Sequence, residues 1–363
     1  MLGKRLVIGK RLLACLLVVA LAVVIMGCAG QTASEKKGEQ EQAQEQAKEQ
    51  QQQPAQKVVI KYSHNYPSTF SHYKAAEKFK EYVEATSQGQ IEVQLYPNAQ
   101  LGTNREQVEG VQQGSIELVV QPTAFLTVFV PEMQVLDLPF MFKSVDQAWK
   151  ILDGDVGMDL LGHLEGVGLK GLAYTGMGFK QITTGKNRAV RTPEDLKGLK
   201  MRIMQSPIIQ AQYEAWGAVP VPTSLQELYN ALQQGVVDGQ ENDIRTIYTQ
   251  KFYEVQTNMT ISNHAFLPSV MMVNKKWFEG LSKEHQDIIR KGARVAVELD
   301  RSLLVQDEAA ALKSIADYGL KIVELSEDER EAFRKPILPI YDQIRQKIGS
   351  EIVDAFVKAT QSE

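Results

Sequence analysis

An arginine inside an apolar strand pattern is the residue of this sequence best suited to chemistry. Residues 199–204 read LKMRIM, and strand alternation puts Arg202 on the same face as Met204. Arg202 stands near the end of this strand, before a turn at residues 205–207, and ligands of α/β sheets gather at the carboxyl ends of strands. A guanidinium group binds a carboxylate through two parallel hydrogen bonds. The alternative is a structural ion pair on an edge strand, which periodicity alone favours.

A second polar candidate follows a turn that contains two glycines. Residues 235–242 read GVVDGQEN, and the glycines permit tight turns on either side of a short strand. Asn242 at the end of this segment offers both a hydrogen-bond donor and an acceptor to a polar ligand. Taken alone, the segment is only a loop.

The sequence lacks the usual signatures of catalysis and of metal binding. It has no GxxxxGK[ST] phosphate loop, no HExxH, no GxSxG and no EF-hand loop. No two of its five histidines stand four residues apart, which disfavours a compact helical metal site. We therefore predict no catalytic residue, no metal site and no cofactor. Several loosely spaced acidic residues are expected at the surface and in turns, namely Asp137, Asp153, Asp155, Asp159 and Glu165.

Composition excludes further classes of protein. The chain has 363 residues, of which 44% are hydrophobic and 23% charged, enough for a large core and for two domains rather than one. Its net charge of −4 is too close to neutral for a nucleic-acid-binding protein. The two cysteines are Cys15 and Cys28, so residues 29–363 carry no disulfide, thiolate ligand or sulfur nucleophile.

Both cysteines belong to an N-terminal targeting segment. Four basic residues precede an apolar run over residues 12–26, which is shorter than the roughly 20 residues of a membrane-spanning helix. Residues 25–28 (IMGC) resemble a bacterial lipobox, so we predict a signal peptide over residues 1–27 and a lipidated Cys28; the alternative is an uncleaved anchor helix. Cleavage changes the net charge from −4 to −8, because four basic residues and no acidic one are removed. The Gln- and Glu-rich residues 28–57 are predicted to be a linker.

From residue 58 onward the hydrophobic pattern alternates between strand and helix periods. This order predicts an α/β fold with a parallel or mixed sheet covered by helices. One helical pattern, over residues 282–316, is too long for an ordinary domain helix. The predicted strands are residues 58–62, 91–95, 116–120, 168–174, 200–204 and 270–273, and the predicted helices are residues 72–85, 107–113, 225–233 and 282–316.

These features, in this order, resemble the solute-binding proteins of tripartite ATP-independent periplasmic (TRAP) transporters, in the dicarboxylate-binding (DctP) family. The resemblance covers essentially the whole chain from residue 58 onward. The motifs that carry it are residues 97–102 (PNAQLG), 136–142 (LDLPFMF), 194–202 (EDLKGLKMR), 231–242 (ALQQGVVDGQEN), 251–256 (KFYEVQ) and 263–264 (NH).

The resemblance implies a two-lobed α/β fold of the periplasmic-binding-protein kind, type II-like, with mixed sheets and hinge strands. The first lobe is expected to comprise residues 58–177 and about 268–307, and the second residues 178–267 and about 308–363. A long helix that spans both lobes accounts for the pattern over residues 282–316. A chain that crosses between lobes more than once suits closure about a hinge.

The resemblance also implies a ligand site in the cleft between the lobes. Arg202 is expected to grip the ligand carboxylate, and Asn242 to line the same cleft. Lys180 stands where the family usually has a second arginine, and Leu225 stands where an aromatic residue often lies against the ligand. The remaining candidates are His64, Asn65, Gln121 and His264, the last of which is otherwise a structural histidine.

Together these expectations describe a transport protein rather than an enzyme. The chain is expected to capture an organic acid, a C4-dicarboxylate or a sugar acid, outside the cytoplasm and to deliver it to the small and large subunits of a TRAP permease. Sialic acid is not expected, because Gln121 and Ala124 replace the acidic residue and the arginine of its binders. Alternatives are a lipoprotein that senses a ligand for a signalling receptor, and a lipid-anchored enzyme with His264 as general base. No nucleic acid is expected as a partner.

Overall fold

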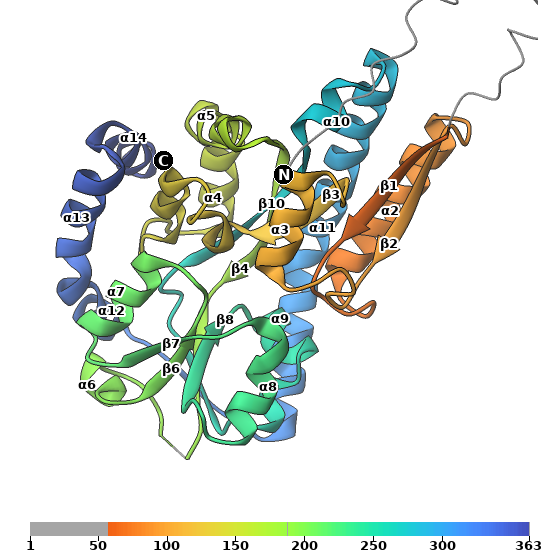
Figure 1. Ribbon diagram of the computed structural model, residues 1–363. Helices are drawn as coiled ribbons and strands as arrows, with labels where there is room; N and C mark the ends of the chain where they lie inside the picture. Colours follow the sequence, from red (N-terminus) through yellow and green to blue (C-terminus); the bar gives the residue numbers. More distant parts are fainter. Residues whose placement is uncertain (1–56, 187, 363) are drawn as a thin grey trace, which may run out of the picture. The chain divides into compact units, whose positions relative to one another are not determined.

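The computed structural model describes residues 57–186 and 188–362, whose strands form two sheets (Figure 1). The predicted signal peptide, Cys28 and nearly all of the predicted linker lie outside the described residues. Within the described part, no helix combines the length and the apolar character needed to cross a membrane.

The first sheet has five strands and is mixed. β1 pairs in parallel with β2 and β3, whereas β10 runs antiparallel to β3 and β4. Every residue of β10 is buried, and its side chains alternate between two apolar cores, with Met272 in one and Met271 in the other. In sheet order the strands are β2 (Ile91–Tyr96), β1 (Val58–Ser63), β3 (Leu118–Pro122), β10 (Phe266–Asn274) and β4 (Leu169–Phe179).

The second sheet has six strands and is also mixed. β6 lies between β7 and β8 and is parallel to both, while β5 is antiparallel to β8 and β9. All residues of β5 and β8 are buried, as in strands that are covered on both faces. In sheet order the strands are β11 (Lys321–Glu324), β9 (Asn258–Ile261), β5 (Gln181–Thr184), β8 (Gly239–Asn242), β6 (Lys200–Ile203) and β7 (Val219–Pro222).

Helices cover the sheets, and several begin at strong capping residues. Thr103 and Ser326 each exchange hydrogen bonds with a glutamate three residues later, which satisfies backbone donors at the helix start. The helices are α2 (Ser71–Thr86), α3 (Asn104–Gln113), η1 (Thr123–Leu126), η2 (Pro131–Asp137), α4 (Val145–Leu152), α5 (Asp155–Gly162), η3 (His163–Val167), α6 (Pro193–Leu196), α7 (Pro207–Ala215), α8 (Leu225–Gln233), α9 (Ile244–Thr249), η4 (Phe252–Glu254), α10 (Lys275–Glu279), α11 (Lys283–Tyr318), α12 (Glu327–Arg334), η5 (Lys335–Ile337), α13 (Leu338–Ile348) and α14 (Ser350–Gln361).

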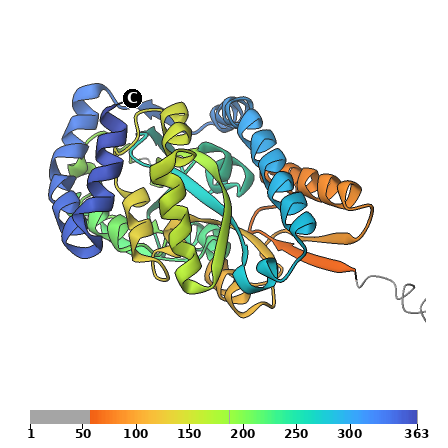
Figure 2. The ribbon, with the colours of Figure 1, turned by 90° about the horizontal axis from the view of Figure 1, so that it is seen from above.

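Within the described residues, the chain passes from one sheet to the other at three places. β4 continues into β5 through Lys180, β9 returns into β10 through residues 262–265, and α11 runs past both sheets (Figures 1 and 2). The first two crossings lie side by side, because the N–H of Lys180 donates to the carbonyl of Ala265 at 2.8 Å. α11 packs against α2 and β4 of the first lobe and against α9 of the second. The predicted two-lobed fold with hinge strands and a spanning helix is confirmed.

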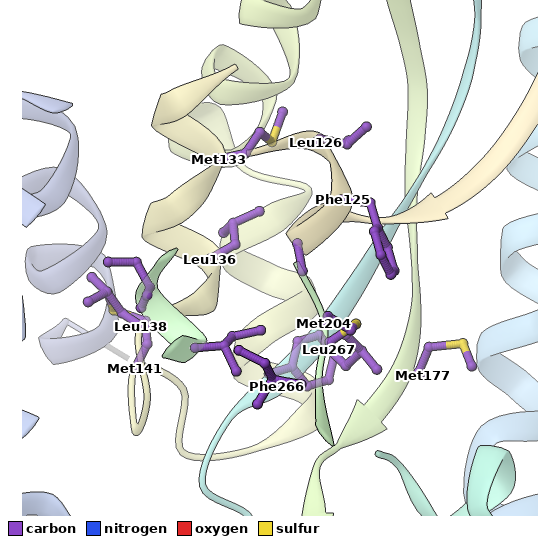
Figure 3. Close-up of a cluster of buried hydrophobic side chains, with 14 of the residues drawn as sticks. Phe125, Leu126, Met133, Leu136, Leu138, Met141, Met177, Met204, Phe266 and Leu267 are labelled. Carbon is purple, nitrogen blue, oxygen red and sulfur yellow. The ribbon is translucent and has the colours of Figure 1, made fainter. Parts of the chain in front are cut away.

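An apolar core joins the two sheets where the chain crosses. Figure 3 shows side chains of η1 and η2 together with Met177 of β4, Phe266 and Leu267 of β10, and Met204, which follows β6. All four of these named side chains are buried. Burial of such a side chain contributes about 1.5–3 kcal/mol, so this core holds both lobes against the crossing strands.

The C-terminal helices extend toward the first sheet. α14 packs against α4 and α5, and α13 packs against α7 and η2. The sequence grouped residues 308–363 with the second lobe, whereas these contacts connect α14 with helices between β3 and β4. The division of the chain into lobes at the predicted residues stays a prediction.

The helices and strands predicted from hydrophobic periodicity are found in the structure, although some of their boundaries differ from the predicted ones. The pattern over residues 282–316 forms α11, and α3 begins at Asn104 because Thr103 caps it. The strand predicted between Gly235 and Gly239 is wrong, since these residues form a turn and β8 begins at Gly239. A side chain at position 239 would lie 2.4 Å from the carbonyl oxygen of Thr183, so this glycine permits the close approach of β5.

Gly176 in β4 is required by the packing of the core. A Cβ atom there would lie 2.0 Å from Cη2 of Trp149, whose ring is held by Arg301 on one face and by the edge-to-face contact with Phe266. We expect Gly176→Ala to lower the free energy of unfolding by about 1–3 kcal/mol, as measured by urea denaturation. Gly162→Ala is the control, because no atom lies within 4 Å of its added Cβ. Equal stability of the two variants would contradict this account.

Candidate functional site

Arg202 is a buried cation whose guanidinium is only partly satisfied. Its side chain is 1% exposed, and Nε donates to the carbonyl of Thr223 at 2.8 Å. Neither Nη1 nor Nη2 has a hydrogen-bond partner among the described residues. Burial lowers the pKa of Arg202 to about 10, opposed by the nearby Glu241 and Tyr66. Two convergent donors on one buried charge form a site for an anion with two oxygens.

A pocket of about 220 Å³ is lined by residues of both lobes, and Arg202 is not among them. Thr223, whose carbonyl holds Arg202, lies in its wall on the side of the second lobe, and Phe125 of η1 lies in its wall on the side of the first lobe. Tyr66 of the first lobe is buried, which raises its pKa, while Arg202 acts in the opposite direction on that pKa. The lining residues are Thr103, Asn104, Arg105, Phe125, Gln205, Pro222, Thr223, Ser224 and Glu227.

The first lobe contributes a cluster of four buried amide side chains. Asn104 Nδ2 donates to Gln121 Oε1 at 2.6 Å, and Gln121 Nε2 donates to Asn65 Oδ1 and to Gln107 Oε1, each at 2.9 Å. Gln107 Nε2 donates to Asn65 Oδ1 at 2.9 Å and to the carbonyl of Gly102 at 2.6 Å. The structure thus brings together the predicted residues Asn65 and Gln121. Sequence reasoning missed Asn104 and Gln107, whose only signal is their place at the start of a capped helix.

Lys180 does not present a free charge. Its Nζ lies 2.8 Å from Oε1 of Glu241, and the second oxygen of that carboxylate lies 2.7 Å from Nε2 of His264. His264 Nδ1 in turn contacts Ser262 Oγ at 2.7 Å. All of these side chains are buried at the two strand crossings, so Lys180 and His264 form a charged hinge cluster with Glu241.

The pKa values of the hinge cluster follow from its enclosure. Burial alone raises the pKa of Glu241, but Lys180 and His264 lower it to about 2. Burial lowers the pKa of His264 below its usual value, against the opposing effect of Glu241. At neutral pH Glu241 is therefore a carboxylate and His264 a neutral imidazole. Glu241 stands in the segment that the sequence singled out for Asn242, and strand alternation places the two on opposite faces.

The remaining predicted site residues, Asn242, Leu225 and His64, are buried outside the hinge cluster. Asn242 is buried and donates from Nδ2 to Gln240 Oε1 at 2.6 Å. Leu225 is the first residue of α8 and is buried next to the pocket-lining Ser224. His64 is buried with its Nδ1 accepting from the N–H of Tyr66 at 3.3 Å, and burial lowers its pKa to about 3.

A second buried charged cluster, unpredicted from the sequence, connects α9 with the first lobe. Arg245 Nη1 donates to Ser71 Oγ and Nη2 donates to the carbonyl of Gly176, both at 2.8 Å. Asp300 of α11 lies 3.7 Å from the same guanidinium and 2.6 Å from Nδ1 of His72. This cluster ties the second lobe to α2, β4 and α11 in the present arrangement. Its hydrogen bonds join residues that are 69, 174 and 228 positions apart in the sequence, so no local pattern indicates them.

Asp137 is not the surface residue that its spacing suggested. It is 2% exposed, and Ser206 Oγ donates to its Oδ2 at 2.6 Å across the two lobes. Burial raises the pKa of Asp137 to about 6, although Lys180 and the Ser206 hydroxyl act against this. Among the described residues there is no group of three or more His, Cys, Asp or Glu side chains arranged to hold a metal ion.

Comparison with known proteins assigns this architecture to one family. Residues 62–347 match the DctP family, described as bacterial extracellular solute-binding protein, family 7. The C4-dicarboxylate-binding periplasmic protein DctP of Rhodobacter capsulatus is 35% identical over 308 residues, which are 84% of this chain and 92% of that protein.

Solved structures with bound acids are similar to the whole described chain. The sugar acid binding protein DctPAm of Advenella mimigardefordensis, in complex with galactonate, has a TM-score of 0.82 at 34% identity, covering 85% of this chain and 99% of that one. A TRAP periplasmic solute binding protein of Sulfurospirillum deleyianum with bound succinate has a TM-score of 0.79 at 33% identity, covering 83% and 98%.

The hinge cluster gives a test of buried charge compensation. We expect Glu241→Gln to lower the free energy of unfolding at pH 7 by about 3–5 kcal/mol, because it leaves the ammonium of Lys180 buried without its counter-charge. Adding Lys180→Met should restore part of this loss, since the unpaired charge is then removed. Both values come from urea denaturation. A double variant as unstable as Glu241→Gln would contradict the pairing.

The buried Asp137 gives a test of pH dependence. Its pKa is raised to about 6, so the folded protein still holds a proton at a pH where the unfolded chain, with a carboxyl pKa near 4, has released it. The free energy of unfolding therefore falls as the pH rises from about 4 to about 6. Asp137→Asn removes this effect and can still accept from Ser206. We compare the free energy of unfolding of Asp137→Asn with that of the native protein at each pH. We expect this difference to favour the variant by about 2–3 kcal/mol more at pH 7 than at pH 4. An equal difference at both pH values in urea denaturation would contradict the assignment.

Proposed function

Because the chain belongs to the DctP family of bacterial extracellular solute-binding proteins, we propose that it captures an organic acid between its lobes and delivers it to a TRAP permease. The family consists of substrate-binding transport proteins, so the chain is not an enzyme. The proposed ligand is an acid of the kind bound by the relatives, a sugar acid or a C4-dicarboxylate.

The observation that carries this proposal is the open fork of Arg202. A buried charge without compensation is costly, and the two unpartnered Nη atoms match the two oxygens of one carboxylate. The Nε bond to Thr223 fixes the plane of the guanidinium before any ligand arrives. A clamp that is held in place in this way loses little side-chain entropy on binding.

The surrounding residues are proposed to divide between ligand contact and hinge. Asn242, Leu225, Asn65 and Gln121 are proposed to line the ligand cleft, together with the neighbouring His64. Lys180 and His264 are proposed to act at the strand crossings through Glu241, because their polar atoms are bonded within that cluster. Closure of the two lobes about these crossings would enclose the ligand.

Delivery is proposed to occur at a membrane. A lipidated Cys28 would tether the mature protein to a membrane outside the cytoplasm, on its periplasmic side or on the outer face of the cytoplasmic membrane, with the rest of residues 28–57 as the linker to the folded part. The closed lobes would together present the surface that the permease subunits bind. With a charge of −8 after cleavage, the protein cannot attract an anion over long distances, so recognition depends on the local field of Arg202.

The clamp is tested by Arg202→Ala. A hydrogen bond to a charged group contributes about 1.5–3 kcal/mol, and loss of the fork should weaken binding of galactonate or succinate by about tenfold to a hundredfold or more. The measurement is isothermal titration of the purified mature protein, with a thermal melt to show that the variant folds. Arg191→Ala is the matched control, because this arginine of the same lobe is half-exposed and pairs with Glu329. Affinity of Arg202→Ala within twofold of the native protein would refute the clamp.

A further inference from the structure

We propose that the end of the ligand remote from Arg202 carries a hydroxyl group rather than a second carboxylate. The substrate class would then be hydroxy acids and sugar acids rather than unsubstituted C4-dicarboxylates. This inference rests on the proposed carboxylate clamp and concerns the opposite wall of the same cleft, where the amide cluster of Asn65, Asn104, Gln107 and Gln121 lies.

The orientation of the amide cluster is set by one backbone carbonyl. The carbonyl of Gly102 can only accept, so the group that Gln107 turns toward it must be the Nε2 donor. Gln107 Oε1 then faces Gln121 and must receive the Nε2 donor of that residue. Each amide thus fixes the next, and the assignment of oxygen and nitrogen follows from the network rather than from either side chain alone.

The network ends with one free acceptor and one free donor. Gln121 Oε1 accepts from Asn104 Nδ2, and Oδ1 of Asn104 has no hydrogen-bond partner among the described residues. Asn65 Oδ1 accepts from Gln107 and Gln121, and within the same part of the chain Nδ2 of Asn65 has no partner either. Asn104 is 3% exposed and Asn65 4%, and leaving either atom unsatisfied has a cost.

A pocket lies between the amide cluster and the residue that holds Arg202. Asn104 lines this pocket together with Thr223, whose carbonyl accepts from the Arg202 Nε atom. Asn65 belongs to the same cluster, because Gln121 accepts from Asn104 and donates to Asn65 Oδ1. A ligand that is held by the guanidinium and extends through this pocket would reach the amide cluster.

A hydroxyl group can form hydrogen bonds with both unpartnered amide atoms of this wall, whereas a carboxylate cannot. A hydroxyl both donates and accepts, so it can give a proton to Asn104 Oδ1 and accept from Asn65 Nδ2. An ionised carboxylate only accepts and would face the lone pairs of Asn104 Oδ1. Arg105 also lines the pocket, but it is 53% exposed, its Nε pairs with Glu109 at 2.8 Å, and the acidic Glu227 lines the same pocket.

The first test compares acids on the native mature protein, so it needs no variant to fold. D-erythronate and succinate both have four carbons, and they differ in carrying hydroxyls or a second carboxylate. We expect D-erythronate or D-galactonate to bind at least about tenfold more tightly than succinate in isothermal titration. Succinate binding as tightly as both hydroxy acids would overturn this inference and leave the carboxylate clamp standing. Failure of all three acids to bind would overturn the proposed function itself.

The second test assigns the preference to Asn104. Asn104→Ala should weaken binding of the hydroxy acids about tenfold or more while leaving succinate affinity unchanged, because only the hydroxyl uses Oδ1. Asn230→Ala is the matched control, because this asparagine is exposed on α8 and is not among the residues that line the pocket, so it should change neither affinity by more than about twofold. An equal loss for all acids in Asn104→Ala, or a loss in Asn230→Ala as large as in Asn104→Ala, would overturn the assignment.

Discussion

The cleft is organised around a buried positive charge that the protein does not neutralise completely. Arg202 enters the interior because β6 is an inner strand, paired on one side with β7 and on the other with β8. The fold supplies one carbonyl for Nε and no acceptor among the described residues for the other two nitrogens. Because a buried charge is costly unless it is paired and hydrogen-bonded, an anion at these two nitrogens would supply the missing partner, as we propose.

At the strand crossings a second buried positive charge, that of Lys180, is neutralised by a neighbouring carboxylate of the protein itself. Lys180 is as deeply buried as Arg202, yet Oε1 of Glu241 lies 2.8 Å from its Nζ. The other oxygen of this carboxylate lies 2.7 Å from Nε2 of His264. The hinge is thereby charged but internally balanced, and its hydrogen bonds join the link between β4 and β5, strand β8 and the return segment before β10. A point charge with a local counter-ion suits this position, whereas a planar fork suits the recognition of a carboxylate. Of these two buried cations, Lys180 is paired within the protein, and Arg202 is the one that we propose to bind a ligand.

Sequence reasoning predicted the fold for identifiable physical reasons, whereas its site residues stay predictions. The long helix and the strands of the first sheet follow from local periodicity, because each period reflects which face is buried. Arg202 became a ligand candidate through the resemblance to the family, since periodicity alone favoured a structural ion pair. The state of Lys180 was beyond this reasoning, since its partner Glu241 is 61 residues away and neither residue's neighbours reveal the pair. Asp137 was assigned to the surface from spacing alone, and only the fold brings Ser206 to it. Asn104 was missed because the predicted helix began at residue 107, whereas α3 begins at Asn104, which lines the pocket.

Closure of the lobes and recognition of the ligand can be understood as one process, because the polar groups without hydrogen-bond partners are divided between the two lobes. The unpartnered guanidinium nitrogens belong to the second sheet, whereas the unpartnered amide atoms of Asn65 and Asn104 belong to the first lobe. When the lobes separate, water can hydrogen-bond to all of them at little cost. When the lobes close without a ligand, both sets lose that water and remain unsatisfied. The proposed ligand, reaching from the guanidinium to the amides, would satisfy both sets at once, so its binding free energy would be realised mainly in the closed form and would shift the protein toward it.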